Sequence, residues 1–306
     1  MRVHLPARLR LTNFDDLYGQ LHHLPQSESL ELHMERLAFA EPAGLLPLVC
    51  VLRNHVIAGG ALTIRTFPQD SDVCGYLERI NFYKLVGCPC PHEPGRRTHN
   101  DAFIEITEIG GTSSDRRVGN KLTSLLKGRV DVKNATGESF LSACGELVDN
   151  TRHAYNPAIE PQAKNWPLAL ILGQYYPESN TLHVTVADCG IGILRSLGAK
   201  DPEQTFDKDS EAIDRALVLG MKGTGSLGKG MGLAAIQRFM KQNGGIFAIR
   251  SGECLTTRSA RRKKHRYRAN WKGTVVSLEI NGARNIDISC IIQKMAQEAG
   301  EHKRDT

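Results

Sequence analysis

The chain lacks any apolar run long enough to cross a membrane, and no apolar stretch follows its first residues. A bilayer-spanning helix needs roughly 20 apolar residues, and a secretion signal needs an apolar core of its own. Met1 instead leads into a charged segment. With 306 residues, of which 41% are hydrophobic, the sequence predicts a globular cytoplasmic protein of two domains with no membrane partner.

The dense cysteine pattern of a small secreted protein is also lacking, because the eight cysteines are spread over a long chain. We therefore expect reduced thiols. The tightest group is Cys-Pro-Cys-Pro-His at residues 88–92. A structural zinc site takes a fourth ligand and wider, paired spacing, so this group favours a proline-stiffened connection over a metal site.

Excess basic charge is lacking outside one segment. Seven Lys or Arg residues and no acid lie between Arg258 and Arg268. Without those seven, 32 of the 39 basic residues remain against 33 acidic ones, so the rest of the chain is nearly neutral. Such a run favours a solvated loop. Attraction to the phosphates of DNA or RNA through residues 258–268 is the alternative, with Tyr267 and Trp271 available to stack on bases.

Residues 1–95 alternate between strand and helix patterns. They predict a strand from Ser29 to near Phe39, a helix through 45–52, a strand over 59–65 and a helix through 73–82. This alternation is typical of a small α/β unit. Residues 88–100, rich in Pro, Gly and charge, are the expected linker.

The second part of the chain predicts a larger α/β domain. We expect strands at 102–108, 167–176, 181–187, 245–250 and 274–280, and helices at 116–132, 137–155, 231–242 and 286–298. Between Arg195 and Gly228 the composition is polar, with one helical stretch near 211–219. A long irregular segment is typical of a lid or binding loop.

The helix expected at 137–155 has an apolar face and a polar one. Glu146, Asn150 and His153 project together from the polar face by the 3.6-residue period. An amide oxygen suits Mg²⁺ beside phosphate oxygens, and a carboxylate can hold or deprotonate a water. A face open to solvent is the alternative interpretation.

Asp188 follows an apolar strand and precedes Gly190 and Gly192. A carboxylate at a strand end can accept a hydrogen bond from the exocyclic amine of adenine, and glycines let the backbone approach the ring. An ordinary turn has the same composition, so this pattern alone leaves both interpretations open.

Five glycines crowd residues 223–232, where a helix is expected to begin. Freed backbone amides and the positive end of a helix favour phosphate, to which Lys229 could add a charge. A flexible surface loop is the alternative. The Gly-x-x-x-x-Gly-Lys-Ser/Thr pattern is lacking, and no strand leads into Gly223 as it does in a dinucleotide-binding fingerprint.

The order of these patterns resembles the ATP-binding motifs of the GHKL superfamily, named for gyrase, heat-shock chaperones, histidine kinases and MutL. Glu146–Asn150 is similar to its N box, and its three glycine boxes resemble Asp188–Gly192, Gly228–Leu233 and Gly273–Thr274. The resemblance covers residues 100–285 and implies a two-layer α/β sandwich of the Bergerat type, which holds ATP beneath a flexible lid. Residues 286–306 remain as a C-terminal helix and tail.

The resemblance also implies roles for single residues. Asn150 would bind Mg²⁺, Glu146 would be the general base, and Asp188 would read adenine. The other implied ATP-binding residues are His153, Gly190, Gly192, Gly228, Lys229, Gly230, Met231, Gly232, Leu233 and Thr274. The expected function is ATP hydrolysis, or phosphoryl transfer as in a serine/threonine kinase, used as a regulatory switch. An ATP-gated interaction module without turnover is the alternative.

Two branches of that superfamily fit less well. No helical hairpin with a phosphoacceptor His is recognisable before residue 100, as a sensor histidine kinase requires. Few residues follow Ile280, where gyrase and MutL proteins place a second domain that supplies a catalytic Lys.

The strand, turn and helix at Leu30–Leu52 resemble, more distantly, those of a STAS domain from bacterial anti-sigma antagonists. Glu41–Gly44 stands at the place of that family's Asp-Ser-x-Gly, but without a Ser or Thr. The resemblance implies a regulatory or docking unit in residues 1–95 rather than a phosphorylation switch. We therefore expect a regulatory protein partner and leave pairing of the chain with itself open.

Overall fold

The structure of the protein is a computed structural model, and no helix among the residues it describes is long and apolar enough to cross a membrane. The fold is mixed α/β with several sheets, as the sequence predicts. The described residues are 1–21, 28–90, 103–109, 112–126, 135–154, 169–199, 205–218, 232–259, 262–284 and 286–302.

The N-terminal unit is built on a parallel sheet with the order β1-β3-β5. Its strands are β1 (Arg2–His4), β3 (Leu30–His33) and β5 (Leu62–Thr66). A second parallel pair joins β2 (Arg8–Leu9) to β4 (Phe39–Ala40). The single strand predicted from Ser29 to near Phe39 is therefore wrong, because a turn after Met34 separates β3 from β4.

Four helices complete this unit over its described residues. They are α1 (Phe14–Leu21), α2 (Pro42–Ile57), α3 (Ser71–Arg79) and α4 (Phe82–Val86). One helix was expected through 73–82, but α3 and α4 are separate because Asn81 adopts a left-handed conformation with φ 66°. Asp70 begins α3 by accepting a hydrogen bond from the Asp72 backbone N–H at 2.7 Å.

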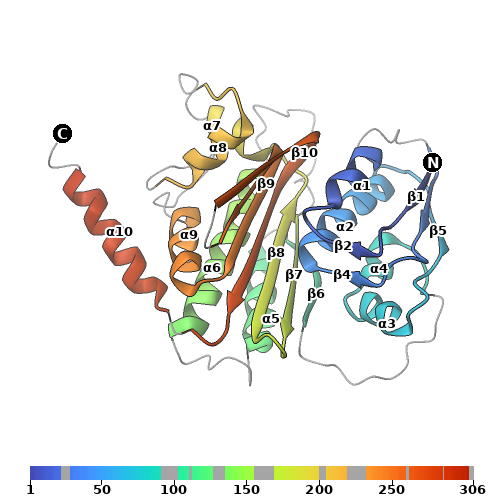
Figure 1. The fold of residues 1–306 in the computed structure, drawn as a ribbon, viewed down its shortest axis with the longest axis horizontal. Coiled ribbons are helices and arrows are strands. Elements are labelled where there is room, and N and C mark those ends of the chain that lie inside the picture. Colours follow the sequence, from blue (N-terminus) through green and yellow to red (C-terminus); the bar gives the residue numbers. More distant parts are fainter. Residues whose placement is uncertain are drawn as a thin grey trace.

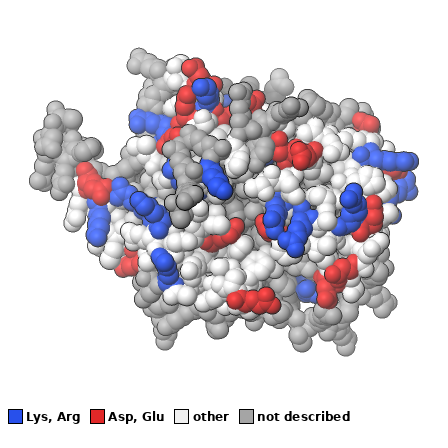
Figure 2. All heavy atoms as spheres, viewed as in Figure 1, with Lys and Arg blue, Asp and Glu red and all other residues white. Residues whose placement is uncertain are grey.

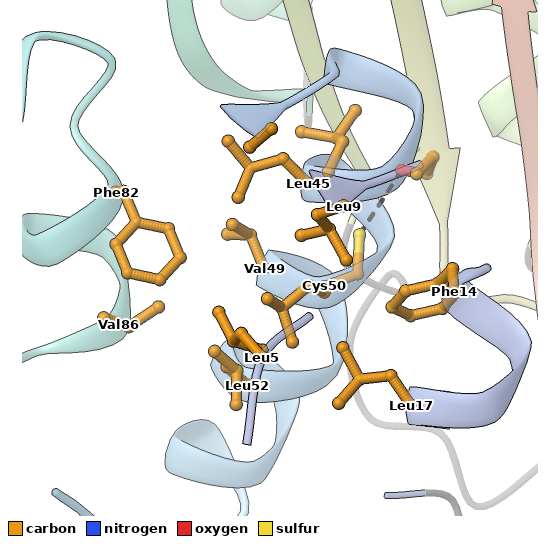
Figure 3. Packing of buried hydrophobic residues seen from close by; sticks show 14 of the residues in the cluster. Leu5, Leu9, Phe14, Leu17, Leu45, Val49, Cys50, Leu52, Phe82 and Val86 are labelled. Atoms are coloured by element: carbon orange, nitrogen blue, oxygen red, sulfur yellow. Dashed lines mark hydrogen bonds between the residues drawn. The ribbon is translucent and has the colours of Figure 1, made fainter. Parts of the chain in front are cut away.

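Helix α2 is the centre of the N-terminal unit. Pro42 occupies its first turn, where a missing N–H costs nothing, and the helix is apolar on all sides as far as Leu52. Such a helix has to be buried all round. Figure 3 shows Leu45, Val49 and Leu52 of α2 among side chains from the first strands, α1 and α4.

The larger sheet has five antiparallel strands in the order β6-β7-β8-β10-β9. The tight β7–β8 turn predicted at residues 177–180 is present, and Asn180 takes a left-handed φ of 47° there. The strands are β6 (Phe103–Ile109), β7 (Ala169–Tyr176), β8 (Thr181–Asp188), β9 (Ile246–Arg258) and β10 (Arg262–Asn281).

Helices cover one face of this sheet, and the N-terminal unit covers the other (Figure 1). Alternation along β10 shows the division, since Val276 and Leu278 pack under the helices and Val275 faces the N-terminal unit. The helices of this part of the chain are α5 (Thr112–Leu126), α6 (Ala135–Asn150), α7 (Gly192–Gly198), α8 (Asp209–Ala216), α9 (Gly232–Asn243) and α10 (Ile288–His302), with a 3₁₀ turn, η1, at Thr151–Ala154. Among the described residues, helix α10 packs on α6 and α9 and not on the sheet itself (Figure 1).

Contacts cross directly from the N-terminal unit to the sheet. The Cys50 thiol on α2 donates to the Ala187 carbonyl at 3.8 Å, and the Tyr76 hydroxyl donates to Gln174 Oε1 at 3.0 Å. The Ile106 backbone N–H donates to the Ile80 carbonyl at 3.0 Å. The two parts therefore share one buried layer, and the proposed boundary at residues 95–100 stays a prediction. Residues 91–100, including His92, lie outside the described residues.

The basic segment is not the solvated loop that its charge predicts. β9 runs to Arg258 and β10 begins at Arg262, with Arg258 and Arg262 paired in the ladder. A strand partner supplies the backbone hydrogen bonds that a loop would take from water. Trp271, considered above as a base-stacking residue, is 2% exposed and lies against Phe14 and Tyr18.

The segment between Arg195 and Gly228 is also more ordered than predicted. Its described part holds the end of α7 as well as α8, and Leu197 and Ile213 are buried in the helix-side core. Residues 200–204 and 219–231 lie outside the described residues. The helix predicted near 211–219 is confirmed as α8, whereas the start of the predicted irregular segment is wrong, because residues 195–198 belong to α7.

Candidate functional site

Asp188 ends β8 as a buried carboxyl, 6% exposed. Its Oδ1 accepts hydrogen bonds from the backbone N–H of Gly190 at 2.9 Å and of Thr274 at 3.2 Å. Burial raises the pKa of Asp188 to about 7, although these two hydrogen bonds act to lower it. A carboxyl held in this way by its own loop and by β10 is a fixed polar group in an apolar surrounding.

The glycines around Asp188 are required by close backbone approach. A Cβ on Gly190 would lie 2.1 Å from the Ala154 carbonyl oxygen, and one on Gly273 would lie 2.0 Å from the Asp188 carbonyl oxygen. Gly273 also has a φ of +118°, which side-chain-bearing residues rarely adopt. Gly192 has a φ of +76° at the start of α7. The loop after Asp188 and the middle of β10, around Gly273, therefore pack backbone against backbone.

Helix α6 turns the predicted apolar face inward. Phe140, Leu147 and Val148 are buried there, as the helical period predicts. Glu146 and Asn150 are half-buried on the neighbouring face. The Asn150 Nδ2 is buried and has no hydrogen-bond partner among the described residues. Burial, and then the charge of Asp149, raise the pKa of Glu146 above its ordinary value.

The start of α9 meets α6 at Glu146. A Cβ on Gly232 would lie 2.2 Å from Glu146 Oε2, so a larger residue there would require the Glu146 carboxylate to move. The positive end of the α9 dipole favours a negative charge at this place. Leu233, next along α9, packs partly buried in the helix-side core. Gly228, Lys229, Gly230 and Met231 lie outside the described residues.

The end of α6 is tied to the loop that follows Asp188. The Ile191 backbone N–H donates to the Ala154 carbonyl of η1 at 2.9 Å. His153 lies in η1, but its side chain is outside the described residues. The structure thus brings Asp188, Gly190, Gly192 and Thr274 together, places Gly232 beside Glu146, and joins the two groups through η1.

Ser251 is a residue of this region that the sequence did not reveal. It is 1% exposed, and its Oγ donates to the Gly273 carbonyl at 3.0 Å and accepts from the Ile193 backbone N–H at 3.0 Å. One hydroxyl therefore joins β9, β10 and α7. A serine inside a strand pattern carries no spacing signal, so no sequence rule would have singled it out.

Helix α8 packs on the outer part of β9 through acidic side chains. Asp209 accepts from the Glu253 backbone N–H at 3.0 Å, and Asp214 pairs with Arg258 at 3.0 Å. This pair neutralises one end of the basic segment. On the face drawn in Figure 2, the described basic and acidic residues are interspersed, without a continuous patch of one sign.

A separate cavity of about 350 Å³ lies at the other end of α9, beside β9. Its guanidinium groups are paired, Arg238 with Glu298 at 2.7 Å and Arg258 with Asp214 at 3.0 Å. This pairing weakens the attraction of the cavity for anions. It is lined by Gln237, Arg238, Met240, Lys241, Phe247, Arg258 and Ser259.

Comparison with protein-family models and with curated proteins finds no match for this sequence. The chemistry of the site therefore has to be derived from its own residues.

Proposed function

We propose that the region around Asp188, Glu146 and Asn150 is a Mg-ATP site of the GHKL type. Its support is that residues of the sequence patterns lie close together. Gly273 and Thr274 of β10 contact Asp188 at the end of β8, and Gly232 at the start of α9 lies beside Glu146 of α6. The order of the patterns resembles that of the Bergerat fold, and an antiparallel sheet with helices on one face is compatible with it.

Two observations support the fit of a magnesium nucleotide. The buried Asn150 Nδ2 lacks a partner among the described residues, and a buried N–H donor of this kind calls for an acceptor such as a phosphate oxygen. Asp188 presents a buried carboxyl at a strand end beside close-packed glycines. In the proposed assignment Asp188 reads the adenine amine, Thr274 supports it, and the Asn150 amide oxygen holds Mg²⁺.

The proposed catalytic residue is Glu146. Its pKa is raised by burial, and a general base works best with a pKa closer to the operating pH than that of an exposed carboxylate. When bound, Mg-ATP supplies a terminal phosphoryl group for transfer to water or to a protein hydroxyl. Glu146 would orient and deprotonate the attacking oxygen, which makes the protein an ATPase or a serine/threonine kinase used as a switch.

The proposal is tested with γ-labelled ATP and Mg²⁺, scored for free phosphate and for labelled protein, alongside nucleotide binding by calorimetry. Asp188→Asn is expected to weaken ATP binding at least tenfold, and Glu146→Ala to abolish turnover while ATP still binds. Glu138→Gln is the matched control, because Glu138 is exposed near the start of the same helix. ATP binding that is unchanged in Asp188→Asn would remove the proposal.

A second candidate is an ATP-gated interaction module without turnover. It is favoured by the contact of α2 with the strand that carries Asp188, through the Cys50 thiol and the Ala187 carbonyl. A conformational change at Asp188 would be transmitted to the N-terminal unit through this contact. In that case Asn150→Ala abolishes both nucleotide and partner binding, whereas Glu146→Ala spares both. Equal partner affinity with and without Mg-ATP would exclude this candidate.

A further inference from the structure

The three strands of the N-terminal sheet end side by side with polar residues. His4 is the last residue of β1, His33 the last of β3 and Thr66 the last of β5. The parallel register pairs His4 with His33, and His33 with Thr66. The carboxyl edge of a parallel sheet is a common place for ligands, because side chains from several strands converge there.

An irregularity in the ladder selects which side chain stands beside His33. The β3–β5 pairing passes from Leu32 and Ile64 directly to His33 and Thr66, and skips Arg65. Such a bulge re-aims the side chains that follow it. Arg65 instead bonds Glu31, with Nη2 at 2.6 Å from Oε1. A hydroxyl, rather than a guanidinium that would repel a cation, therefore lies next to His33.

Glu35, two residues beyond β3, turns its carboxylate toward the same row. Its Oε1 lies 3.3 Å from His4 Nδ1, and the Thr66 hydroxyl bonds its Oε2. His4, His33 and Glu35 each offer one ligand atom, and these atoms all lie within 4.8 Å of one another. The rings of His4 and His33 are stacked at 4.5 Å, which holds the two imidazoles side by side.

The hydrogen bonds leave His33 with a free lone pair. Thr66 Oγ1 already accepts from the Met34 backbone N–H at 3.1 Å and gives its proton to Glu35. It lies 3.5 Å from His33 Nδ1, where it serves as an acceptor. His33 Nε2 is buried and has no hydrogen-bond partner among the described residues. A neutral imidazole with one nitrogen unused is the form that binds metals.

We propose that His4, His33 and Glu35 bind a divalent transition-metal ion of the zinc class at the carboxyl edge of the N-terminal sheet. Two imidazoles and one carboxylate form a three-ligand set that leaves a coordination position open. Imidazole ligands favour zinc and its neighbours over magnesium or calcium, which take oxygen ligands. Thr66 is a positioning residue, because it orients Glu35 without offering a ligand atom of its own. The site is independent of the nucleotide proposal.

The test uses the full chain, stripped with a chelator and titrated with Zn²⁺ and with Co²⁺ in the absence of nucleotide. The wild type should bind one equivalent that His4→Ala and Glu35→Gln lose, and Thr66→Val should bind it about 10–100-fold more weakly. Cobalt absorption separates this site from the cysteines, since a nitrogen and oxygen site shows no thiolate charge-transfer band. His265→Ala, which removes an exposed histidine elsewhere, is the matched control and should keep wild-type affinity.

His4 is the main variant because its side chain is 56% exposed, so its loss leaves the fold intact. Zn²⁺ should raise the melting temperature of the wild type and of His265→Ala but not of His4→Ala. The proposal is overturned if His4→Ala binds as tightly as the wild type, if bound cobalt shows only thiolate absorption, or if no equivalent binds. Each of these results would identify the cluster as a hydrogen-bonded surface without an ion.

Discussion

The two faces of the five-stranded sheet are buried by different kinds of side chain. Under the helices the core is almost wholly apolar, with Phe140, Phe239 and Leu278 fully buried. On the face toward the N-terminal unit, apolar side chains alternate with ionisable ones, among them Arg250 and His183. Interfaces between domains are commonly more polar than domain cores. The comparison shows that one face folds as the interior of a domain, whereas the other is a contact between two units.

Several polar side chains on the second face are paired. Arg250, with no exposed side-chain surface, pairs with Asp15 of α1, and the hydroxyls of Thr185 and Ser277 bond each other at 3.0 Å. Buried charges and hydroxyls are tolerated only when they are paired in this way. A few polar pairs therefore give the contact between the sheet and the N-terminal unit its specificity. The apolar surface of α2 provides its area.

The largest effect on stability is expected when a substitution creates a cavity in the core beneath the helices. Phe239→Ala should lower the free energy of unfolding by about 3–5 kcal/mol, because Phe239 is 0% exposed between α9 and the sheet. Lys241→Ala, exposed on the same helix, is the control and should change it by less than about 0.5 kcal/mol. Denaturant unfolding measures both. A cost for Phe239→Ala no larger than that of the control would remove the contrast between the two faces.

Breaking the charge pair between the units should have the next largest effect. Asp15→Ala leaves the Arg250 guanidinium buried without its carboxylate, and such changes cost about 3–5 kcal/mol. Asp16→Ala is the matched control, since Asp16 is its exposed neighbour on α1. If both variants unfold at the same denaturant concentration, the pair contributes nothing to docking.

A pH dependence should distinguish the polar face from the apolar one. Burial, and then the Glu41 carboxylate, raise the pKa of Glu279 to about 7 from an ordinary 4.5. Between these values the folded protein binds more protons than the unfolded chain, so the free energy of unfolding falls as the pH rises. His183, 4.0 Å from Glu279, acts in the opposite sense, because burial lowers its pKa from 6.5 to about 4 and the unfolded chain binds more protons between these values. Above about pH 6.5 the fall is due to Glu279 alone.

Replacing the Glu279 carboxyl by an amide should remove this loss of unfolding free energy at higher pH. Relative to the wild type, Glu279→Gln should gain about 1 kcal/mol in unfolding free energy between pH 5 and pH 8, a figure reduced for its partial exposure. Glu178→Gln, in the exposed β7–β8 turn, serves as the control. Denaturant unfolding over this pH range measures the effect, and parallel curves for Glu279→Gln and the wild type would contradict it.

The smallest expected effect comes from a single hydrogen bond between the units. Tyr76→Phe removes the 3.0 Å bond to Gln174 and should cost about 1 kcal/mol in urea unfolding. Tyr176→Phe removes the 3.1 Å bond to the same oxygen from within the sheet. If only the Tyr176 variant is destabilised, the Tyr76 bond does not help to dock the two units.

Local patterns were sufficient for many elements. The apolar period of α6, the turn residues between β7 and β8 and the apolar stretch of α2 predicted those elements close to their observed bounds. Predictions from the sequence were wrong where contacts between residues distant in the chain determine the structure. A run of basic residues has no helical or strand period of its own, yet β9 supplies a pairing partner that extends β10 back to Arg262.

The candidate site shows the same division. Spacing on one helix predicted that Glu146 and Asn150 share a face, and the glycine patterns predicted a close approach of the backbone near Asp188. Neither Ser251 nor the row of His4, His33 and Thr66 could be predicted, because their members are distant in sequence and meet only through strand pairing.

The amino-acid sequence by itself determined the mixed α/β class, the polar face of α6 and the order of the glycine patterns, since these depend on residues a few positions apart. Only the tertiary structure decided that the N-terminal unit lies on the far face of the sheet, that Trp271 is buried, and that Gly232 abuts Glu146. The physical reason is that burial and close approach depend on which surfaces meet, and local periodicity carries no information on the partner.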